Sequence, residues 1–353
     1  MKKRLFSLLM VLSLICTMLP TSVFAVEAEY VPLDNVYITE HNPLYPHDSC
    51  SVEEHAPTVD ALHPLEGGQY EDDLSVAAAT IRTAMENRQS TVSVNVFLDG
   101  DTHDGSEAAN KAMMRGIFHD AYAHTGNPTQ GDYLKWVYNT MSAGASGYIS
   151  WGDYYYTITY TITYYTTAAQ EQAVTDKLAQ VMPTFGFTSA TTDYEKVKAI
   201  YDYICANVTY DHENLENESY KLKYTAYAAL INGTSVCQGY ATLLYRMLLM
   251  SGVDTRVVIG TAGGGNHGWN IVKLGAYYYN VDSTWDAGET EYDYFLTCPA
   301  SFDPTHTRGA DYTTAAFHTA YPMADADYDP HTADTLPEGL TYTVSGDNVT
   351  ITG

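Results

Sequence analysis

The sequence predicts an α+β protein, because helix-like and strand-like segments follow one another along it in no regular order. Residues 154–166 alternate tyrosine or isoleucine with threonine, which is the period-two pattern of a half-buried strand with a polar outer face. Residues 167–182 and 192–208 instead carry apolar side chains at helical spacing. A doubly wound sheet would need strands and helices to take turns, so that fold class is disfavoured.

Composition and periodicity divide the chain into five segments. The predicted segments are a signal peptide at 1–25, an extended proline-rich leader at 26–70, an N-terminal α+β region at 71–190, a domain with the chemical motifs at 191–320, and a polar C-terminal tail with a hairpin at 321–353. Within the N-terminal region we expect helices over 73–88 and 106–124 and a strand over 91–98.

The first 25 residues predict export. Three basic residues at 2–4 precede an apolar stretch at 5–19, and the small residues around Ala25 suit a cleavage point. A spanning helix needs about 20 apolar residues, and this stretch is shorter and interrupted by polar side chains and proline. We therefore expect a secreted or cell-surface protein with no membrane association after cleavage.

The charge restricts the partners. The 353 residues include 17 Lys+Arg and 43 Asp+Glu, a formal net charge of −26. A surface this negative repels phosphate backbones and anionic lipids, which argues against nucleic acid and membrane surfaces. A hydrophobic fraction of 45% is that of a folded chain rather than a disordered acidic one. The expected partner is a protein or peptide substrate, with cell-wall peptide as one candidate.

The sequence predicts neither a metal nor an organic cofactor. The leader contains four histidines whose spacings of 6, 8 and 8 match no zinc pattern: His41, His47, His55 and His63. The ligand positions of the acidic loop at 99–104 are out of register with those of an EF-hand, which favours a solvated turn instead. The glycines at 263–265 are followed by neither a helix start nor a lysine, so they are not a phosphate loop.

Cys237 is the first candidate catalytic residue. An apolar run at helical spacing follows it, and Ser235 and Gln238 form a capping-box pattern with Ser235 as the N-cap. A thiol at the second helical position lies at the positive end of the helix dipole, which favours the thiolate. The alternative is a buried structural cysteine. Of the other cysteines after cleavage, Cys205 has a buried apolar setting, and at least one of Cys50, Cys205 and Cys298 is expected to be unpaired.

His267 and Asp282 are the next candidates. Gly275 and Ala276 suit a two-residue hairpin turn, which would place Trp269 opposite Asp282. His267 and Asp282 would then be diagonal neighbours on one face, with Cα atoms roughly 7–8 Å apart. A shift of one residue would put them on opposite faces, so the prediction depends on the register.

Together these side chains form a nucleophile, base and orienting group. His267 would take the proton of Cys237 and return it to a leaving amine, while Asp282 would fix the tautomer of the imidazole. The Cys237 amide is one candidate oxyanion donor. Tyr210 and Gln238 are candidates for the second, with packing and helix capping as their alternative roles.

Several aromatic residues and one further histidine are weaker candidates. Trp269 and Trp285 would wall an acyl-binding site, but core packing is the alternative for aromatic residues on a hairpin. His306 would lie near the site, although a lone histidine usually has no catalytic role.

Three motifs resemble the bacterial transglutaminase-like domain in order and spacing: Val236–Ala241, His267–Asn270 and Val281–Asp286. The segments at 201–211 and 224–232 resemble the helices that precede the cysteine of that family. The resemblance spans about residues 193–302 and does not reach the N-terminal half. It implies a papain-like core, in which a helix bearing Cys237 packs on an antiparallel sheet bearing His267 and Asp282 as the other members of the triad.

The resemblance also implies acyl transfer through a thioester on Cys237, which water or an amine then resolves. We therefore expect an exported cysteine-dependent enzyme that acts on protein or peptide amide bonds, as a peptidase, amidase or transglutaminase. Hydrolysis ranks above cross-linking, because water is the default acceptor. The alternative is a non-catalytic cell-surface or binding module that retains the fold.

Overall fold

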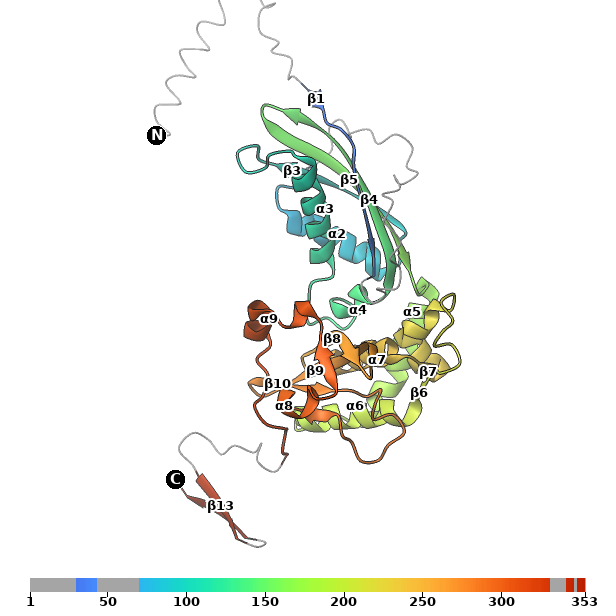
Figure 1. Cartoon of the computed structure of the whole chain (residues 1–353), viewed down its shortest axis with the longest axis vertical. Helices are drawn as coiled ribbons and strands as arrows, with labels where there is room; N and C mark the ends of the chain where they lie inside the picture. The colour runs from blue at the N-terminus through green and yellow to red at the C-terminus, as the bar shows by residue number, and fades with distance from the viewer. Residues whose placement is uncertain (1–29, 43–69, 331–340, 346–347, 353) are drawn as a thin grey trace, which may run out of the picture.

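The computed structural model describes residues 30–42, 70–330, 341–345 and 348–352 (Figure 1). The predicted signal peptide and most of the predicted leader lie outside these residues. Within the described ranges, no helix combines the length and the apolar character that a membrane crossing requires. The described chain forms an elongated molecule with an N-terminal lobe, a second lobe below it in Figure 1, and a small hairpin near the C-terminus.

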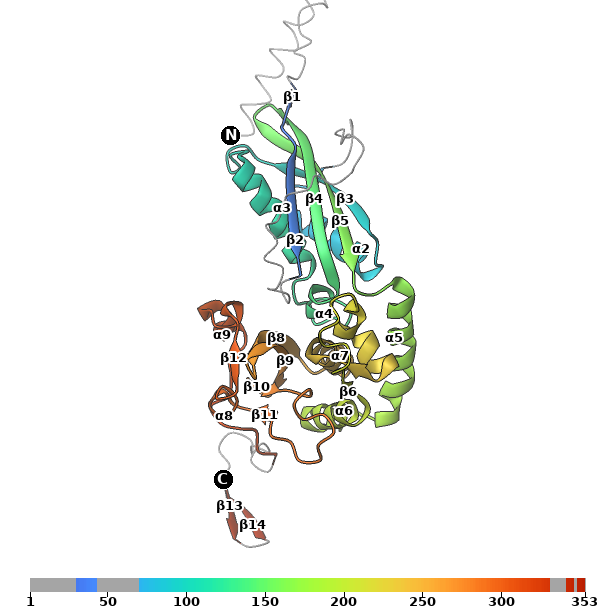
Figure 2. The same cartoon turned by 45° about the vertical axis from the view of Figure 1, so that its right-hand side comes forward.

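The N-terminal lobe is an antiparallel sheet with helices on one face (Figures 1 and 2). Its strands are β1 (Val31–Pro32), β2 (Val36–His41), β3 (Thr91–Leu98), β4 (Tyr138–Ser150) and β5 (Asp153–Tyr164). Strand β5 lies between β3 and β4, and both β1 and β2 pair with β4. The covering helices are α2 (Leu74–Glu86) and α3 (Glu107–Ala121), as the apolar periodicity predicted.

The leader prediction was wrong for residues 31–41, because β1 and β2 lie in it and join the sheet. Val36 and Ile38 are buried in the N-terminal core, and their alternation with Tyr37 and Thr39 is a strand pattern that the surrounding prolines obscured.

The alternating segment at 154–166 forms β5, and its tyrosines and isoleucines face the core as predicted. The predicted polar face is polar but not fully exposed. Thr157 donates to Asn95 on β3 at 2.9 Å, and the hydroxyls of Ser93 and Thr159 lie 2.8 Å apart. Because these partners satisfy each other across the strands, Thr157 and Thr159 are buried without cost to their hydrogen bonding.

The second lobe packs helices against a smaller antiparallel sheet. Its strands, in spatial order, are β11 (Phe295–Thr297), β10 (Tyr277–Val281), β9 (Gly265–Leu274), β8 (Thr255–Ala262) and β12 (His306–Arg308). Its main helices are α5 (Ala168–Val181), α6 (Asp193–Asn207) and α7 (Cys237–Met250). Helix α7 runs between the sheet and the other two helices (Figure 2), and its side chains are buried from Gln238 to Leu248.

Shorter elements make up the rest of the secondary structure in the described residues. They are α4 (Asp132–Lys135), η1 (Met182–Phe185), the parallel pair β6 (Thr209–Tyr210) and β7 (Thr234–Ser235), η2 (Lys221–Tyr224), η3 (Ala228–Asn232), α8 (Pro299–Phe302), η4 (Ala310–Tyr312), α9 (Ala315–Ala320), and the C-terminal hairpin β13 (Thr341–Ser345) and β14 (Asn348–Thr352). The hairpin confirms the one predicted for the tail.

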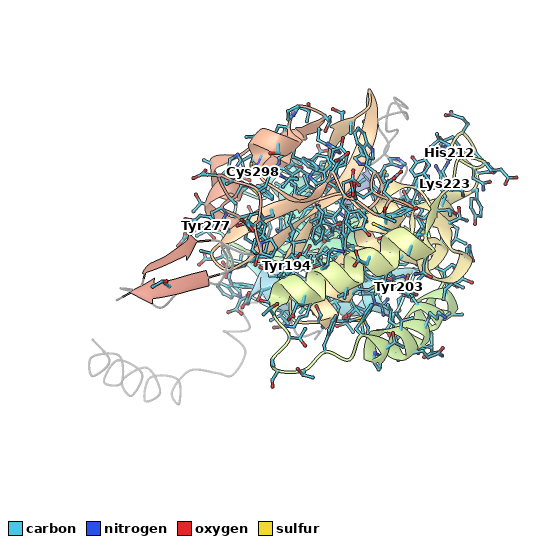
Figure 3. All side chains as sticks on the ribbon, turned by 90° about the horizontal axis from the view of Figure 1, so that it is seen from below. Tyr194, Tyr203, His212, Lys223, Tyr277 and Cys298 are labelled. Carbon is cyan, nitrogen blue, oxygen red and sulfur yellow. The ribbon has the colours of Figure 1, made fainter. Side chains whose placement is uncertain are left out.

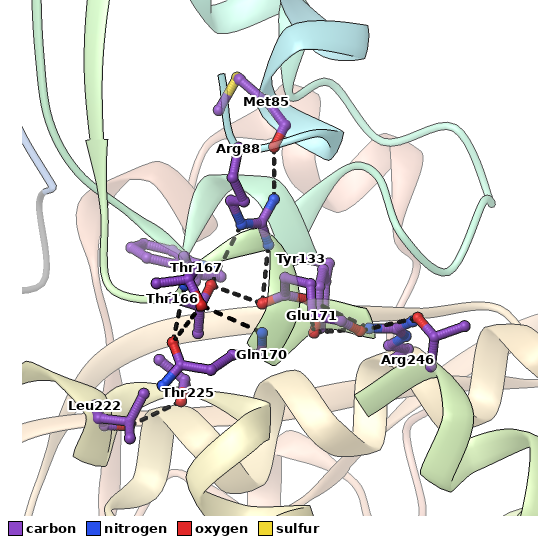
Figure 4. Close-up of polar contacts among 12 residues, drawn as sticks. Met85, Arg88, Tyr133, Thr166, Thr167, Gln170, Glu171, Leu222, Thr225 and Arg246 are labelled. Atoms are coloured by element: carbon purple, nitrogen blue, oxygen red, sulfur yellow. Dashed lines mark hydrogen bonds and ion pairs between the residues drawn. The ribbon is translucent and has the colours of Figure 1, made fainter. Parts of the chain in front are cut away.

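Buried ion pairs join the two lobes. Glu171 on α5 lies 3.0 Å from Arg88, which follows α2, and 3.4 Å from Arg246 on α7 (Figure 4). Burial alone would raise the pKa of Glu171, but the two arginines and the hydroxyls of Thr166 and Tyr133 lower it overall. A carboxylate held in this way is ionised, so it ties strands and helices of both lobes together.

Asp132 on α4 makes the second connection. Its carboxylate accepts two bonds from the Arg256 guanidinium, at 2.7 and 2.9 Å, and one from the Val257 amide at 2.8 Å. Burial opposes ionisation of Asp132, yet the charge and hydrogen bonds of Arg256 lower its pKa overall. This pair fixes the N-terminal lobe to β8, the strand next to the hairpin of candidate site residues.

Candidate active site

Cys237 is the first residue of α7, and it is half-buried with a free thiol. The predicted capping box does not form: Val236 is the N-cap, and no side chain caps the helix. Ser235 is paired within β7, and its hydroxyl donates to the Lys223 carbonyl at 2.8 Å. The position of Cys237 is therefore one residue earlier than predicted, still in the first turn at the positive end of the dipole.

The start of α7 keeps open backbone donors. Among the described residues, the amides of Cys237 and Gln238 donate to no carbonyl or side chain, whereas the Val236 amide donates to Lys223 at 3.1 Å. Unpaired amides at a helix N-terminus stabilise negative charge, both on a thiolate and on an oxygen held beside it.

The hairpin that carries His267 and Asp282 has the predicted turn and register. Gly275 adopts a positive φ of 63° at the turn, and Leu274 pairs with Tyr277. The same register brings His267 Nε2 to 2.6 Å from Asp282 Oδ2. The predicted diagonal relationship is confirmed, and both side chains are buried.

The imidazole of His267 joins the other two groups. With Nε2 directed at Asp282, Nδ1 is the nitrogen left for the Cys237 thiol, which lines the same pocket and lies close enough to His267 to raise the pKa of its imidazole. Burial opposes protonation of His267, but the charges of Asp282 and Cys237 outweigh it and raise the pKa of the imidazole to about 10. The arrangement therefore favours an imidazolium at His267, facing the pocket that Cys237 also lines.

Hydrogen bonds to both carboxylate oxygens stabilise the ionised form of Asp282. Burial alone would raise the pKa of Asp282, but His267 and His306 together lower it well below the usual aspartate value. Oδ1 accepts the amides of Thr284 at 2.9 Å and Trp285 at 3.4 Å. A carboxylate anchored this way can fix the orientation of an imidazole.

His306 also contacts the Asp282 carboxylate directly. Its Nε2 lies 3.1 Å from Asp282 Oδ2, and the residue is buried. The sequence treats it as a lone histidine because its strand, β12, is three residues long and pairs with β8 through no recognisable motif.

A pocket of about 900 Å³ opens over the cysteine. Cys237, His267, Tyr210 and Trp285 line it, as do backbone atoms of the glycines at 263 and 265. Burial raises the pKa of the Tyr210 phenol, so this side chain is a neutral hydroxyl that can donate. Its placement agrees with the candidate role predicted for it, and that role stays a prediction.

The loop at 211–220 forms one wall of the pocket, and Lys223 organises it. The Lys223 ammonium is buried and donates to the carbonyls of Asn214 and Leu215 at 2.7 Å and of Asn217 at 3.1 Å. Figure 3 shows Lys223 close to His212, at the side of the lobe where α6 ends. The pocket wall is thus supported from inside by a charged side chain.

Two predicted site residues also make structural contacts. The side-chain amide of Gln238, which lines the pocket, donates to the Trp136 carbonyl, so one of its two N–H donors is already used. Trp269 does not line the pocket: it is buried, stacks on His267 at 6.1 Å between ring centroids, and donates to Asn280. Trp285 is the tryptophan at the pocket, with 36% of its surface exposed.

The described cysteines form no disulfide. Cys205 and Cys298 are free and buried, and Cys50 lies outside the described residues. Burial raises the pKa of the Cys205 thiol, and the neighbouring Asp286 raises it further. Among the cysteines that the structure describes, Cys237 alone is partly exposed.

His267, Asp282 and His306 are also the group of described residues whose donor atoms could hold a metal ion. A tetrahedral zinc ion with bonds of about 2.0–2.2 Å would keep its ligand atoms about 3.3 Å apart. The direct contact of 2.6 Å between His267 and Asp282 is shorter than that, so the three side chains form a hydrogen-bonded network as they stand.

Comparison with known proteins finds a family model that matches the part of the chain around these residues. Residues 184–283 match the model of the Transglutaminase-like superfamily. This part of the chain is similar to a transglutaminase-like domain. The match contains Cys237, His267 and Asp282, whereas His306 lies beyond its end. The mixed helix-and-sheet architecture agrees with the predicted fold class.

The relatives of the transglutaminase-like domain include curated proteins from two mammals. A kyphoscoliosis peptidase of Homo sapiens and one of Mus musculus are each 32% identical to the chain in an alignment of 140 residues that covers 33% of this chain. The chain spans about a fifth of the length of these relatives, 21% in each case. A crystal structure of a TGase aligns with 21% identity and a TM-score of 0.30, over 40% of this chain and 44% of the other.

Proposed function

We propose that this protein is a cysteine-dependent acyl-transfer enzyme that acts on protein or peptide amide bonds. One observation supports this most strongly: His267 and Cys237 line the same open pocket, and His267 Nε2 lies 2.6 Å from the buried Asp282 carboxylate. This is the arrangement that an activated thiol nucleophile requires.

The first half of the reaction forms a thioester. The Cys237 thiolate attacks the carbonyl carbon of the substrate amide, and the C–N bond breaks as the amine leaves with a proton from the His267 imidazolium. Asp282 compensates the positive charge of that imidazolium, which the buried imidazole could not carry alone.

The second half regenerates the thiol. Water or a primary amine gives a proton to neutral His267 and attacks the thioester, and the sulfur leaves as a thiolate that restores the ion pair. Water yields an acid, and an amine yields a new amide, so one site supports both hydrolysis and cross-linking. We place hydrolysis first, since both mammalian relatives are named as peptidases.

The tetrahedral intermediate needs hydrogen-bond donors for its oxygen. The open amides of Cys237 and Gln238 at the start of α7 are suited to this, and they cost no rearrangement. Tyr210, which lines the same pocket, is our candidate for a side-chain donor.

The pocket suits an extended peptide segment. Its volume of about 900 Å³ is at the upper end for a site that binds a small molecule, and Tyr210, Leu215 and Trp285 give it apolar walls. We extend the proposal to an exported protein that meets its substrate outside the cell, on the basis of the N-terminal sequence alone.

Mass spectrometry of glutamine-containing peptides tests the proposal. The peptides are incubated with the protein, with and without a primary amine, beside Cys237→Ala and the control Cys298→Ala, whose thiol is buried away from the pocket. A cut peptide or a deamidated glutamine that requires Cys237 indicates a hydrolase, and an amine adduct indicates a transglutaminase. Identical products from wild type and Cys237→Ala would contradict the proposal and favour a binding module.

A further inference from the structure

The Asp282 carboxylate contacts two imidazoles, and the proposed mechanism uses only one of them. His267 Nε2 lies 2.6 Å from Asp282 Oδ2, and His306 Nε2 lies 3.1 Å from the same oxygen. The ring centroids of the two histidines are 5.4 Å apart. The second imidazole has no part in the proton transfer between Cys237 and the leaving amine, so its position needs a separate account.

The sheet explains how two histidines from different strands reach one carboxylate. His267 on β9 pairs with Gly260 on β8, and His306 on β12 pairs with Ala262 on β8. Paired residues and residues two apart on a strand share a face, so both imidazoles lie on the same side as these two small residues. A larger side chain on β8 would separate the histidines that Gly260 and Ala262 allow to converge.

His306 is held in a fixed orientation. Its side chain has 0% exposure, and its ring stacks on Phe302 with centroids 3.9 Å apart. Its Nδ1 lies 2.8 Å from the Thr305 hydroxyl. Because Asp282 is ionised, Nε2 carries a proton directed toward it, while Nδ1 contacts a Thr305 hydroxyl that itself donates to the Phe302 carbonyl at 3.1 Å.

His306 therefore supplies one of four donors that surround the Asp282 carboxylate. The others are His267 on Oδ2 and the amides of Thr284 and Trp285 on Oδ1. Without His306, a single imidazole would hold Oδ2, and the carboxylate could turn about its bond to Cβ. His267 would then lose the fixed partner that keeps it aligned with the thiol.

We propose that His306 is a positioning residue that orients Asp282 and thereby keeps the His267 imidazole aligned with Cys237. This inference rests on the proposed function and deepens it, since it adds to the site a residue from the segment beyond the transglutaminase-like match. The segment from 284 to 308 is then part of the catalytic unit, because its last strand carries His306.

The test measures alkylation of Cys237 by iodoacetamide across a range of pH, which needs no substrate. His306→Phe keeps a flat ring but removes the donor, and His306→Gln keeps a donor near the position of Nε2. His124→Phe is the matched control, since His124 also lies 3.1 Å from an aspartate, Asp254, but away from the pocket. Circular dichroism and thermal unfolding establish that each variant is folded.

We expect His306→Phe to slow alkylation of Cys237 about tenfold near neutral pH and to move the pH profile upward, with rates that converge with wild type in alkali. His306→Gln and His124→Phe should retain the wild-type profile. An unchanged profile in His306→Phe overturns the positioning role. If that variant does not fold, His306→Met, which is flexible and lacks the donor, replaces it with the same expectation.

The same experiment separates this inference from the proposed function. If wild-type Cys237 reacts no faster than denatured-state cysteine near neutral pH, the thiol is not activated, and the proposed function fails whatever His306 does. If wild-type Cys237 reacts fast and all His306 variants match it, the proposed function stands and the positioning role fails.

Discussion

His267 and Asp282 are in direct contact at 2.6 Å although 15 positions separate them along the chain. A single hairpin produces this contact, because the turn at Gly275 sets the register of β9 against β10 and so decides which side chains share a face. The stability of that hairpin and the ionisation of its residues are therefore coupled.

That coupling predicts a pH dependence of stability. The pKa of His267 in the folded protein is raised to about 10 from 6.5, so the contribution of the imidazolium to stability is complete below the unfolded value and is lost as pH rises through about 10. Wild type should lose unfolding free energy between neutral pH and pH of about 10. His267→Gln should lose less over the same window. Urea unfolding at several pH values measures both, and parallel losses in the two proteins would refute the assignment.

The face-sharing of His267 and Asp282 could be derived from the sequence because a two-residue turn leaves one register. The same reasoning failed at Ser235, where the capping-box spacing is present but the hydroxyl bonds to Lys223, a residue that η2 brings close. A short sequence pattern predicts contacts between residues that are close in the chain, whereas β7 pairs with β6, which is distant in sequence. A tertiary partner overrides the local preference there.

His306 and the Gln238 contact were beyond sequence reasoning for a related reason. His306 reaches Asp282 only because β12 pairs with the edge of β8, more than 40 positions earlier in the chain. A strand of three residues has too short a pattern for this pairing to be predicted from the sequence. Gln238 reaches the Trp136 carbonyl because the N-terminal lobe packs on the start of α7. Contacts between lobes depend on their docking, for which a single sequence has no periodic signal.

The contact between the lobes predicts that substitution of Arg256 lowers the free energy of unfolding by a large amount. Arg256→Met leaves the buried Asp132 carboxylate without its cation, and we expect a loss of about 3–5 kcal/mol in the free energy of unfolding. Lys196→Met, which breaks a pair with the exposed Asp193, should cost less than about 1 kcal/mol. Denaturant titration of both variants measures the difference, and equal losses would show that the Asp132 pair is not structural.

Gly260 should tolerate no side chain. A Cβ atom there would lie 1.9 Å from the Thr307 carbonyl oxygen on β12, so Gly260→Ala must displace the strand that carries His306. We expect loss of stability together with slower alkylation of Cys237. Gly116→Ala is the control: Gly116 lies inside α3, a Cβ added there would meet no atom within 4 Å, and alanine should stabilise the helix by up to about 1 kcal/mol. Thermal unfolding of both variants tests this contrast, which a stable Gly260→Ala would contradict.

Substitutions at Tyr210 and Gln238 should have different effects on the kinetic parameters. If the Tyr210 hydroxyl donates to the oxyanion, Tyr210→Phe lowers kcat by about 10²-fold or more and leaves KM nearly unchanged, because the donor acts in the transition state. Gln238→Leu removes the bond to Trp136 instead, so it should lower stability and change kcat little in the fraction that remains folded. Steady-state kinetics at a temperature well below unfolding distinguish them. A kcat for Tyr210→Phe equal to wild type would leave the amides at the start of α7 as the donors that carry the oxyanion.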